Sequence, residues 1–185
     1  MSKATDYNKM TPREHVLARP DTYIGSIEKS TESMDICRPM EDESYTIVNQ
    51  LTTYVPGLWK CFDELLVNAS DARANDETCD TIKVYYDKTE QCIRVFNNGM
   101  KGIPVEEHPE YKTLVPSMIF GEMLTSSNYD DSKKRTTGGR NGYGAKLANI
   151  LSRRFEVTVG DSKNEKLFHQ VWRDNMSIAE KPSIK

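Results

Sequence analysis

The sequence predicts a single domain of the α/β (α+β) class. Its 185 residues are enough for one domain with a proper core and too few for two. Residues 58–73 repeat their apolar side chains with the period of a helix. Residues 81–87 and 91–96 alternate in polarity on either side of a short connection, which is the pattern of a β-hairpin. Helices and strands are therefore both expected.

The composition excludes several classes of protein. Hydrophobic residues make up 37% of the chain and charged residues 29%, which is ordinary for a soluble protein. No apolar run is long enough to cross a membrane, and the first residues lack the apolar core of a signal peptide. The cysteines show no CxxC spacing, so we expect a reducing, intracellular compartment and no structural zinc. The net charge of −3 argues against this chain being the main contact with DNA.

The N-terminal part of the chain mixes an arm, a helix, a loop and a strand. The polar residues before Thr11 predict a loose arm. Thr11 is the expected N-cap, and Glu14 its capping-box partner, of a short helix that ends before Pro20. Residues 28–43 are polar and aperiodic, so we expect a surface loop there. Residues 45–55 are rich in β-branched and aromatic side chains and predict one or two strands.

The helix expected at residues 58–73 has two different faces. The apolar face, which should point to the core, carries Leu58, Phe62, Leu65, Ala69 and Ala72. The polar face is narrow and carries Glu64, Asn68 and Asp71. Cys61 and Val67 flank it in place of lysine or arginine, so it is not a freely solvated surface. It belongs either to a working site or to a structural polar network.

Two further segments carry polar groups that a ligand could use. Asn97 opens an Asn-Asn-Gly turn at a strand end, where its amide suits the edge of a nucleobase; an ordinary turn is the alternative. Residues 116–124 predict a short amphipathic helix. Residues 125–135 follow with hydroxyls, amides and charges, which is typical of a lid or, alternatively, of a solvated loop.

A glycine-rich stretch at residues 137–150 organises the chain. Glycine lets the backbone approach an anion without a Cβ in the way, and a helix start adds unpaired N–H groups and a positive dipole end. The stretch therefore predicts a phosphate cradle, with a flexible glycine loop as the alternative. It is not a Walker A loop, because Ala145 stands where that motif requires lysine.

The last part of the chain predicts one more helix and two strands. The helix is expected at residues 144–152. Strands are expected at residues 155–159 and 166–172, around a turn at Gly160 and Asp161.

Five stretches of sequence resemble the N-terminal ATPase domain of eukaryotic-type type II DNA topoisomerases, which belongs to the GHKL (Bergerat) superfamily. In chain order they are EHVLARPDTYIGS, VPGLWKCFDELLVNASD, NNGMKGIP, LTSSNYDD and TTGGRNGYGAKLANI. Matches this long and in this order are highly specific, and they run over nearly the whole chain.

The resemblance implies a fold and a division of the chain. The fold is a two-layer α/β sandwich with helices on one face of a mixed, mostly antiparallel sheet, and ATP lies between the helices and the lid. Residues 1–22 would form the N-terminal arm and first helix, and residues 23–185 the GHKL ATP-binding domain. The family's transducer domain and DNA-cleavage core are not in this sequence.

The resemblance also implies roles for single residues. Glu64 matches the general base that activates water, and Asn68 matches the residue whose side-chain oxygen holds Mg²⁺. Asn97 matches the position that recognises the adenine edge, and Tyr7 matches an arm residue that reaches the partner protomer's nucleotide. Ribose and phosphate contacts match Ser126, Ser127 and Asn128. The loop that wraps the triphosphate matches Gly139, Arg140, Asn141, Gly142, Tyr143, Gly144, Ala145 and Lys146, the last adding charge.

These roles lead us to expect an ATPase that uses ATP and Mg²⁺ and forms a homodimer through its arm when ATP is bound. Double-stranded DNA would be a partner of the full-length enzyme only, in the nucleus if the source is a eukaryote, and no membrane is involved. Without the transducer lysine, this chain should bind Mg-ATP, hydrolyse it weakly and leave DNA uncut. One departure is that Met100 and Lys101 both lie between Gly99 and Gly102, where the family turn has one residue.

Two alternative functions remain at this stage. The first is an ATP-operated dimerisation clamp without chemistry of its own. The second is a histidine-kinase-type catalytic domain, although no dimerisation helix pair precedes the cleft in this sequence.

Overall fold

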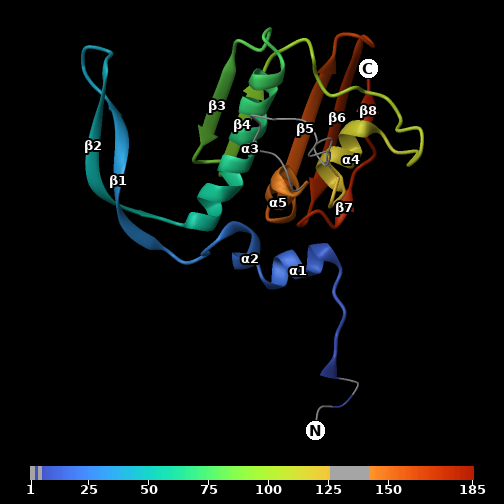
Figure 1. The fold of residues 1–185 in the computed structure, drawn as a ribbon, viewed down its shortest axis with the longest axis horizontal. Helices are drawn as coiled ribbons and strands as arrows, with labels where there is room; N and C mark the ends of the chain where they lie inside the picture. Colours follow the sequence, from blue (N-terminus) through green and yellow to red (C-terminus); the bar gives the residue numbers. More distant parts are fainter. Residues whose placement is uncertain (1–2, 4–5, 126–141) are drawn as a thin grey trace, which may run out of the picture.

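The computed structural model describes residues 3, 6–125 and 142–185. Figure 1 shows the β1–β2 hairpin standing apart on the left, the other strands beside one another with α3, α4 and α5 against them, and the N-terminal segment leading away from the body. The elements are α1 (Pro12–Ala18), α2 (Asp21–Ile24), β1 (Ser30–Pro39), β2 (Tyr45–Tyr54), α3 (Pro56–Asn75), β3 (Ile82–Asp87), β4 (Cys92–Asn97), α4 (Val115–Gly121), α5 (Gly144–Ile150), β5 (Arg154–Asp161), β6 (Lys166–Arg173), β7 (Ile178–Ala179) and β8 (Ser183–Ile184).

All strand pairings among the described residues are antiparallel, and they form three sheets. β1 pairs with β2, β3 pairs with β4, and β6 pairs with β5 and with the short strands β7 and β8. In the second sheet Ile82 lies opposite Asn97, so the hairpin expected at residues 81–96 is confirmed. Helices packed on antiparallel strands confirm the expected α/β (α+β) class.

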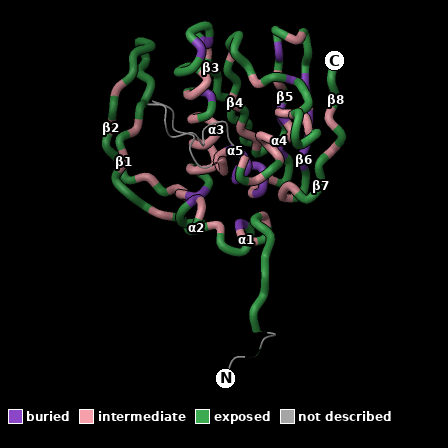
Figure 2. Tube along the Cα trace, turned by 45° about the vertical axis from the view of Figure 1, so that its right-hand side comes forward, coloured by how far each residue is buried: buried purple, intermediate pink, exposed green. Residues whose placement is uncertain are grey.

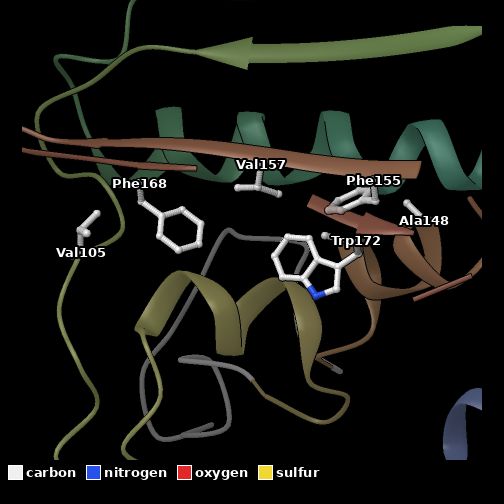
Figure 3. Packing of buried hydrophobic residues seen from close by; sticks show 7 residues of the cluster. Val105, Ala148, Phe155, Val157, Phe168 and Trp172 are labelled. Atoms are coloured by element: carbon white, nitrogen blue, oxygen red, sulfur yellow. The ribbon is translucent and has the colours of Figure 1, made fainter. Parts of the chain in front are cut away.

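The main core lies between one face of β5–β6 and the helices. Phe155 pairs with Trp172 and Val159 with Phe168, so their side chains share that face. Figure 3 shows Val157, Phe168 and Trp172 within this layer, where Phe168 has no exposed surface. The side chains packed against it come from three helices: Cys61 and Leu65 of α3, Phe120 of α4, and Ala145 and Ala148 of α5. The helices therefore cover one face of this sheet, as a two-layer fold requires.

A second, smaller cluster joins the N-terminal helices to α5. It contains Val16 of α1, Ile24 of α2, and Leu147 and Ile150 of α5. Residues 145–150 of α5 are all buried, because one side of this short helix faces the main core and the other faces the second cluster. Figure 2 shows buried residues concentrated in α5, β5 and β6. The helix that ends the glycine stretch is thus the most enclosed of the described elements.

Several expectations for the N-terminal half are confirmed. Thr11 caps α1, and Glu14 completes the reciprocal capping box. β2 is a single strand within the range expected for strand structure. In α3, Ala69 is buried and Leu65 packs on the core, as the apolar stripe predicts, but Leu58 is 64% exposed. The expectation that Leu58 faces the core is wrong, because the first turn of α3 packs through Gly57 against Ile24 and Leu58 lies on the exposed side of that turn.

Two other expectations are wrong. Residues 28–43 are not a loop: Ser30–Pro39 form β1, which pairs along its whole length with β2. The polar composition hid this strand, because its stabilisation comes from the ladder with β2 and not from a buried face. The turn after β5 is not at Gly160 and Asp161, which remain in the strand; the chain turns at residues 162–165.

Within the described ranges, no helix combines the length and apolar character that a transmembrane span needs.

Candidate functional site

The described end of the glycine stretch is a helix start, and among the residues that the structure describes no side chain caps its backbone N–H groups. Gly142 has φ of +65°, a left-handed conformation that glycine adopts without strain. Tyr143 is the N-cap of α5, and its side chain makes no capping hydrogen bond. With respect to the described residues, the first N–H groups of α5 therefore retain donor capacity for an anion, as the cradle interpretation requires.

The Glu64 carboxylate lies directly against this helix start. A β-carbon on Gly144 would overlap Oε2 of Glu64, so the glycine leaves the space that the carboxylate occupies. The Glu64 side chain is 22% exposed, and its Oε1 accepts a hydrogen bond from the Lys60 ammonium at 2.8 Å. Residues far apart in the sequence, on α3 and α5, are thus brought together at the place where the sequence predicts a base beside a phosphate cradle.

Two neighbours of Glu64 on α3, Lys60 and Cys61, have shifted pKa values. Hydrogen bonds to Glu64 and Asp63 raise the pKa of Lys60, so its ammonium stays charged beside the carboxylate. Burial, with the Glu64 charge nearby, raises the pKa of the Cys61 thiol to about 11. Cys61 therefore stays protonated and is not a nucleophile at neutral pH. Asn68 lies one helical turn after Glu64 and is exposed, so its amide oxygen is accessible to a ligand.

The Lys146 side chain, which the resemblance assigns as a charge in the triphosphate loop, lies inside the fold. It is 4% exposed, and its Nζ donates a hydrogen bond to the carbonyl of Thr125 at 2.6 Å. Burial lowers the pKa of Lys146 to about 8. Nearby, Asn149 of α5 donates to the Phe120 carbonyl at 2.9 Å. Both side chains tie α5 to the end of α4 and the residues that follow it, and Lys146 holds the carbonyl of Thr125 there.

Asn97 is the last residue of β4, and its side chain is exposed. Its Nδ2 donates to the carbonyl of Asn98 at 3.2 Å, and no other polar contact of this side chain is recorded in the described part of the chain. The turn that follows is anchored to Asp76. Hydrogen bonds from Thr78 and Lys101 lower the pKa of this carboxyl to about 2. Asn97 is therefore an accessible amide on a firmly held turn.

Tyr143 faces the N-terminal helices. Its ring contacts that of Tyr23 edge to face, with centroids 6.2 Å apart. Both rings border an open pocket of about 400 Å³, which also has walls from α1 and from residues 8–11. Tyr7, in the segment that leads away from the body, is 77% exposed. No sequence pattern marks this pocket, because its walls come from four separate stretches: residues 8–15, Tyr23, residues 123–124 and Tyr143.

Several predicted site residues lie outside the described residues: Ser126, Ser127, Asn128, Gly139, Arg140 and Asn141. The described part brings Glu64 against Gly144, with Asn68 on the same helix as Glu64, whereas Ala145 packs into the main core. In that part no group of three or more His, Cys, Asp or Glu residues could hold a metal ion. An exposed amide oxygen such as that of Asn68 nevertheless fits Mg²⁺, which often takes few protein ligands and completes its shell with phosphate oxygens and water.

The sequence matches one protein family along most of its length. A family model described as "Histidine kinase-, DNA gyrase B-, and HSP90-like ATPase" matches residues 54–172. That range contains α3, the Asn97 turn and the start of α5.

Curated relatives with similar sequences are type II topoisomerases. DNA topoisomerase 2-alpha of Gallus gallus is 51% identical over 179 residues, which is 97% of this chain and 11% of that protein. DNA topoisomerase 2 of Pisum sativum is 49% identical over 96% of this chain and 12% of its own length. The chain thus spans about a tenth of these relatives.

Solved structures with the same fold also come from these enzymes. The ATPase region of Saccharomyces cerevisiae topoisomerase II superposes with a TM-score of 0.93 at 44% identity, over all of this chain and 48% of that one. The ATPase and transducer domains of DNA topoisomerase II from Balamuthia mandrillaris give 0.91 at 49% identity, over all of this chain and 46% of that one.

Proposed function

The chain belongs to the family of histidine kinase-, DNA gyrase B- and HSP90-like ATPases, and we propose that it is the ATP-binding and ATP-hydrolysing module of a type II DNA topoisomerase. The observation that carries the proposal is the Glu64 carboxylate, which lies against Gly144 where α5 begins. A base beside unpaired N–H groups is what hydrolysis of a bound triphosphate needs.

The site residues that the structure describes each have a role in this proposal. The N–H groups at the start of α5 bind the phosphates, and Gly144 keeps the Glu64 carboxylate close to them. Glu64 accepts the proton of the attacking water, while Lys60 holds the carboxylate in place through Oε1. Asn97 donates to or accepts from the edge of adenine. Lys146 supports the site by fixing the carbonyl of Thr125.

We propose Asn68 as the protein ligand for Mg²⁺. Its amide is exposed and lies one turn from Glu64 on α3. Mg²⁺, when bound, neutralises charge on the phosphates and orients them. The outer contacts, namely Ser126, Ser127, Asn128, Gly139, Arg140 and Asn141, remain assigned by resemblance alone.

The partners of the whole enzyme are proposals too. ATP binding would pair two chains through the N-terminal arm, with Tyr7 reaching the partner's nucleotide, and would close a gate on double-stranded DNA in the nucleus. The exposure of Tyr7 and the outward course of residues 6–11 support this arrangement. The two curated relatives named above are topoisomerases, which favours this function over a histidine-kinase-type domain.

The test is Glu64→Gln in the 185-residue chain, with Glu110→Gln as the control because Glu110 is exposed between β4 and α4. Titration calorimetry with a non-hydrolysable ATP analogue and Mg²⁺ measures binding, and light scattering measures mass. Phosphate release measures turnover. We expect Glu64→Gln to bind the analogue and pair as the unmodified chain does, while turnover falls by at least about a hundredfold.

Two outcomes contradict the proposal. If the unmodified chain does not bind the analogue, the site is not a nucleotide site. If Glu64→Gln hydrolyses ATP as fast as Glu110→Gln, Glu64 is not the base. Binding and pairing without any turnover in the unmodified chain would favour the dimerisation clamp.

A further inference from the structure

The turn that carries Asn97 is held by the connection between α3 and β3. Asp76, at the C-terminal end of α3, is 3% exposed. Its Oδ2 accepts the backbone N–H of Lys101 at 2.7 Å, and its Oδ1 accepts the Thr78 hydroxyl at 2.6 Å and the Thr78 N–H at 3.0 Å. Gly99 packs so closely on this carboxylate that a β-carbon there would lie 2.6 Å from Oδ2. A buried carboxylate thus joins two segments of backbone.

The Thr78 hydroxyl extends this contact by one step. It donates to Asp76 and at the same time accepts the backbone N–H of Met100 at 2.9 Å. Met100 and Lys101 are the two residues between the glycines of the turn. Asp76 therefore holds the backbone N–H of Lys101, and Thr78 holds that of Met100. The additional residue in this turn is accommodated by a donor–acceptor pair and does not leave the turn loose.

The other end of the turn is anchored in the same way. Oδ1 of Asn98 accepts the N–H groups of Asp80 at 3.1 Å and Thr81 at 2.9 Å, and its Nδ2 donates to the Asp80 carboxylate at 2.7 Å. The backbone N–H of Asn98 donates to Thr81 at 3.2 Å. Asn97, directly before it, is left as the accessible amide of the turn.

We infer that the connection between α3 and β3, through Asp76 and Thr78, positions Asn97 and thereby sets the preference of the site for adenine over guanine. The inference rests on the proposed ATP site. Asp76 and Thr78 are positioning residues, since they act on the base through the turn and do not touch it.

The physical reason is that base discrimination depends on the placement of a few hydrogen-bonding groups. A group displaced by a fraction of an ångström loses the directional bond that separates adenine from guanine, whereas binding of phosphates by backbone N–H groups elsewhere is unaffected. The turn that carries Asn97 contains two glycines and would be mobile without its anchors. A fixed turn therefore favours selectivity, and a loose one favours equal binding of both bases.

The test uses Thr78, because it is exposed and valine has nearly its shape, so the variant keeps the fold. Thr78→Val removes the hydroxyl that links Asp76 to Met100, and Thr78→Ser retains it. Thr53→Val is the matched control, since Thr53 is an exposed threonine on β2 whose hydroxyl is bonded to Thr31. Dissociation constants are measured by calorimetry in the 185-residue chain for non-hydrolysable analogues of ATP and GTP and for tripolyphosphate.

We expect Thr78→Val to weaken binding of the ATP analogue by about tenfold, as loss of a well-placed hydrogen bond does. Binding of the GTP analogue and tripolyphosphate should stay within about twofold of the unmodified chain. Thr78→Ser and Thr53→Val should match the unmodified chain for all three ligands.

Three results overturn the inference. Equal ATP-analogue affinity in Thr78→Val and Thr78→Ser shows that the hydroxyl does not position the base. An equal loss for all three ligands in Thr78→Val indicates general loosening of the site. An unmodified chain that binds ATP and GTP analogues alike has no preference to be set. Absence of any nucleotide binding by the unmodified chain instead refutes the ATP site itself, on which the inference depends.

Discussion

The carboxylate of Glu64 occupies the space that a side chain at position 144 would need, so the residue at the start of α5 must be glycine as long as Glu64 keeps its place. Glu64 comes from the middle of α3, and Gly144 opens a helix that is buried on both sides. The fit between them is therefore set by the packing of two helices that cannot easily move apart.

Gly144→Ala tests this fit. The added methyl overlaps Oε2 of Glu64, and the carboxylate must swing away from the helix start. We expect ATP turnover to fall at least about tenfold, because the base no longer lies beside the phosphates. Phosphate release and binding of a non-hydrolysable analogue are the measurements.

The control for this variant is Gly160→Ala. A β-carbon at Gly160 meets nothing within 4 Å, so turnover and stability should stay close to those of the unmodified chain. If the two alanine variants turn over ATP equally fast, the contact between Glu64 and Gly144 does not contribute to turnover.

The buried lysine of α5 predicts a rise of stability with pH. Burial lowers the pKa of Lys146 to about 8, whereas an unfolded chain keeps its lysines protonated to about pH 10.4. Between these values the unfolded state binds more protons, so the free energy of unfolding increases as the pH rises. Relative to Lys146→Met, the unmodified chain should gain on the order of 2–3 kcal/mol between pH 7 and 10.5, and less if water reaches the ammonium.

Urea denaturation at several pH values measures this difference. Lys181→Met is the comparison, because Lys181 is exposed near the C-terminus and its removal should leave the pH profile unchanged. Parallel profiles for the unmodified chain and Lys146→Met would place the ammonium in water, contrary to the structure.

The buried carboxyl of Asp76 predicts that the free energy of unfolding decreases as the pH falls into the acid range. Hydrogen bonds from Thr78 and Lys101 lower the pKa of Asp76 to about 2, below that of an unfolded aspartate. The stabilisation is thus fully present above about pH 4 and is lost as the pH falls toward 2. Asp76→Asn should be less stable than the unmodified chain at pH 6, and the gap should close in acid. Urea denaturation measures the difference in free energy of unfolding between the two proteins. A difference that stays constant from pH 6 to pH 2.5 would contradict the low pKa of the Asp76 carboxylate.

The packing of the core between β5–β6 and the helices predicts that removing the Phe168 ring strongly destabilises the protein. Phe168 has no exposed surface, so Phe168→Ala should lower the free energy of unfolding by about 3–5 kcal/mol. Leu167, its neighbour in β6, is 46% exposed, and Leu167→Ala should cost less than about 1 kcal/mol. Chemical denaturation distinguishes them, and similar costs at both positions would mean that the register of β6 is shifted by one residue.

The elements predicted correctly are those whose signals are local. The capping box of Thr11 and Glu14 lies within four residues, and the α3 periodicity and the β3–β4 alternation can be seen in one stretch of sequence. β1 was missed because its polar residues become a strand only by pairing with β2, which is a longer-range event.

The candidate site was predictable in part for the same reason. Spacing places Glu64 and Asn68 on one face of α3, but only the packing of α3 on α5 brings Glu64 against Gly144. The place of Lys146 was not predictable, because its partner is a backbone carbonyl at Thr125 that no sequence pattern marks. Asp76 was missed as well, since its role depends on a turn more than twenty residues away.

The hairpin of β1 and β2 has a consequence for the behaviour of the protein in concentrated solution. Each strand is ten residues long, and in the described part of the chain neither outer edge is paired with another strand. Ile47 and Leu51 are 65% and 76% exposed on one of its faces. Open edges of this kind attract other strands, and the acidic residues 41–43 at the tip oppose such stacking by mutual repulsion. Neutralising that tip should make the protein aggregate.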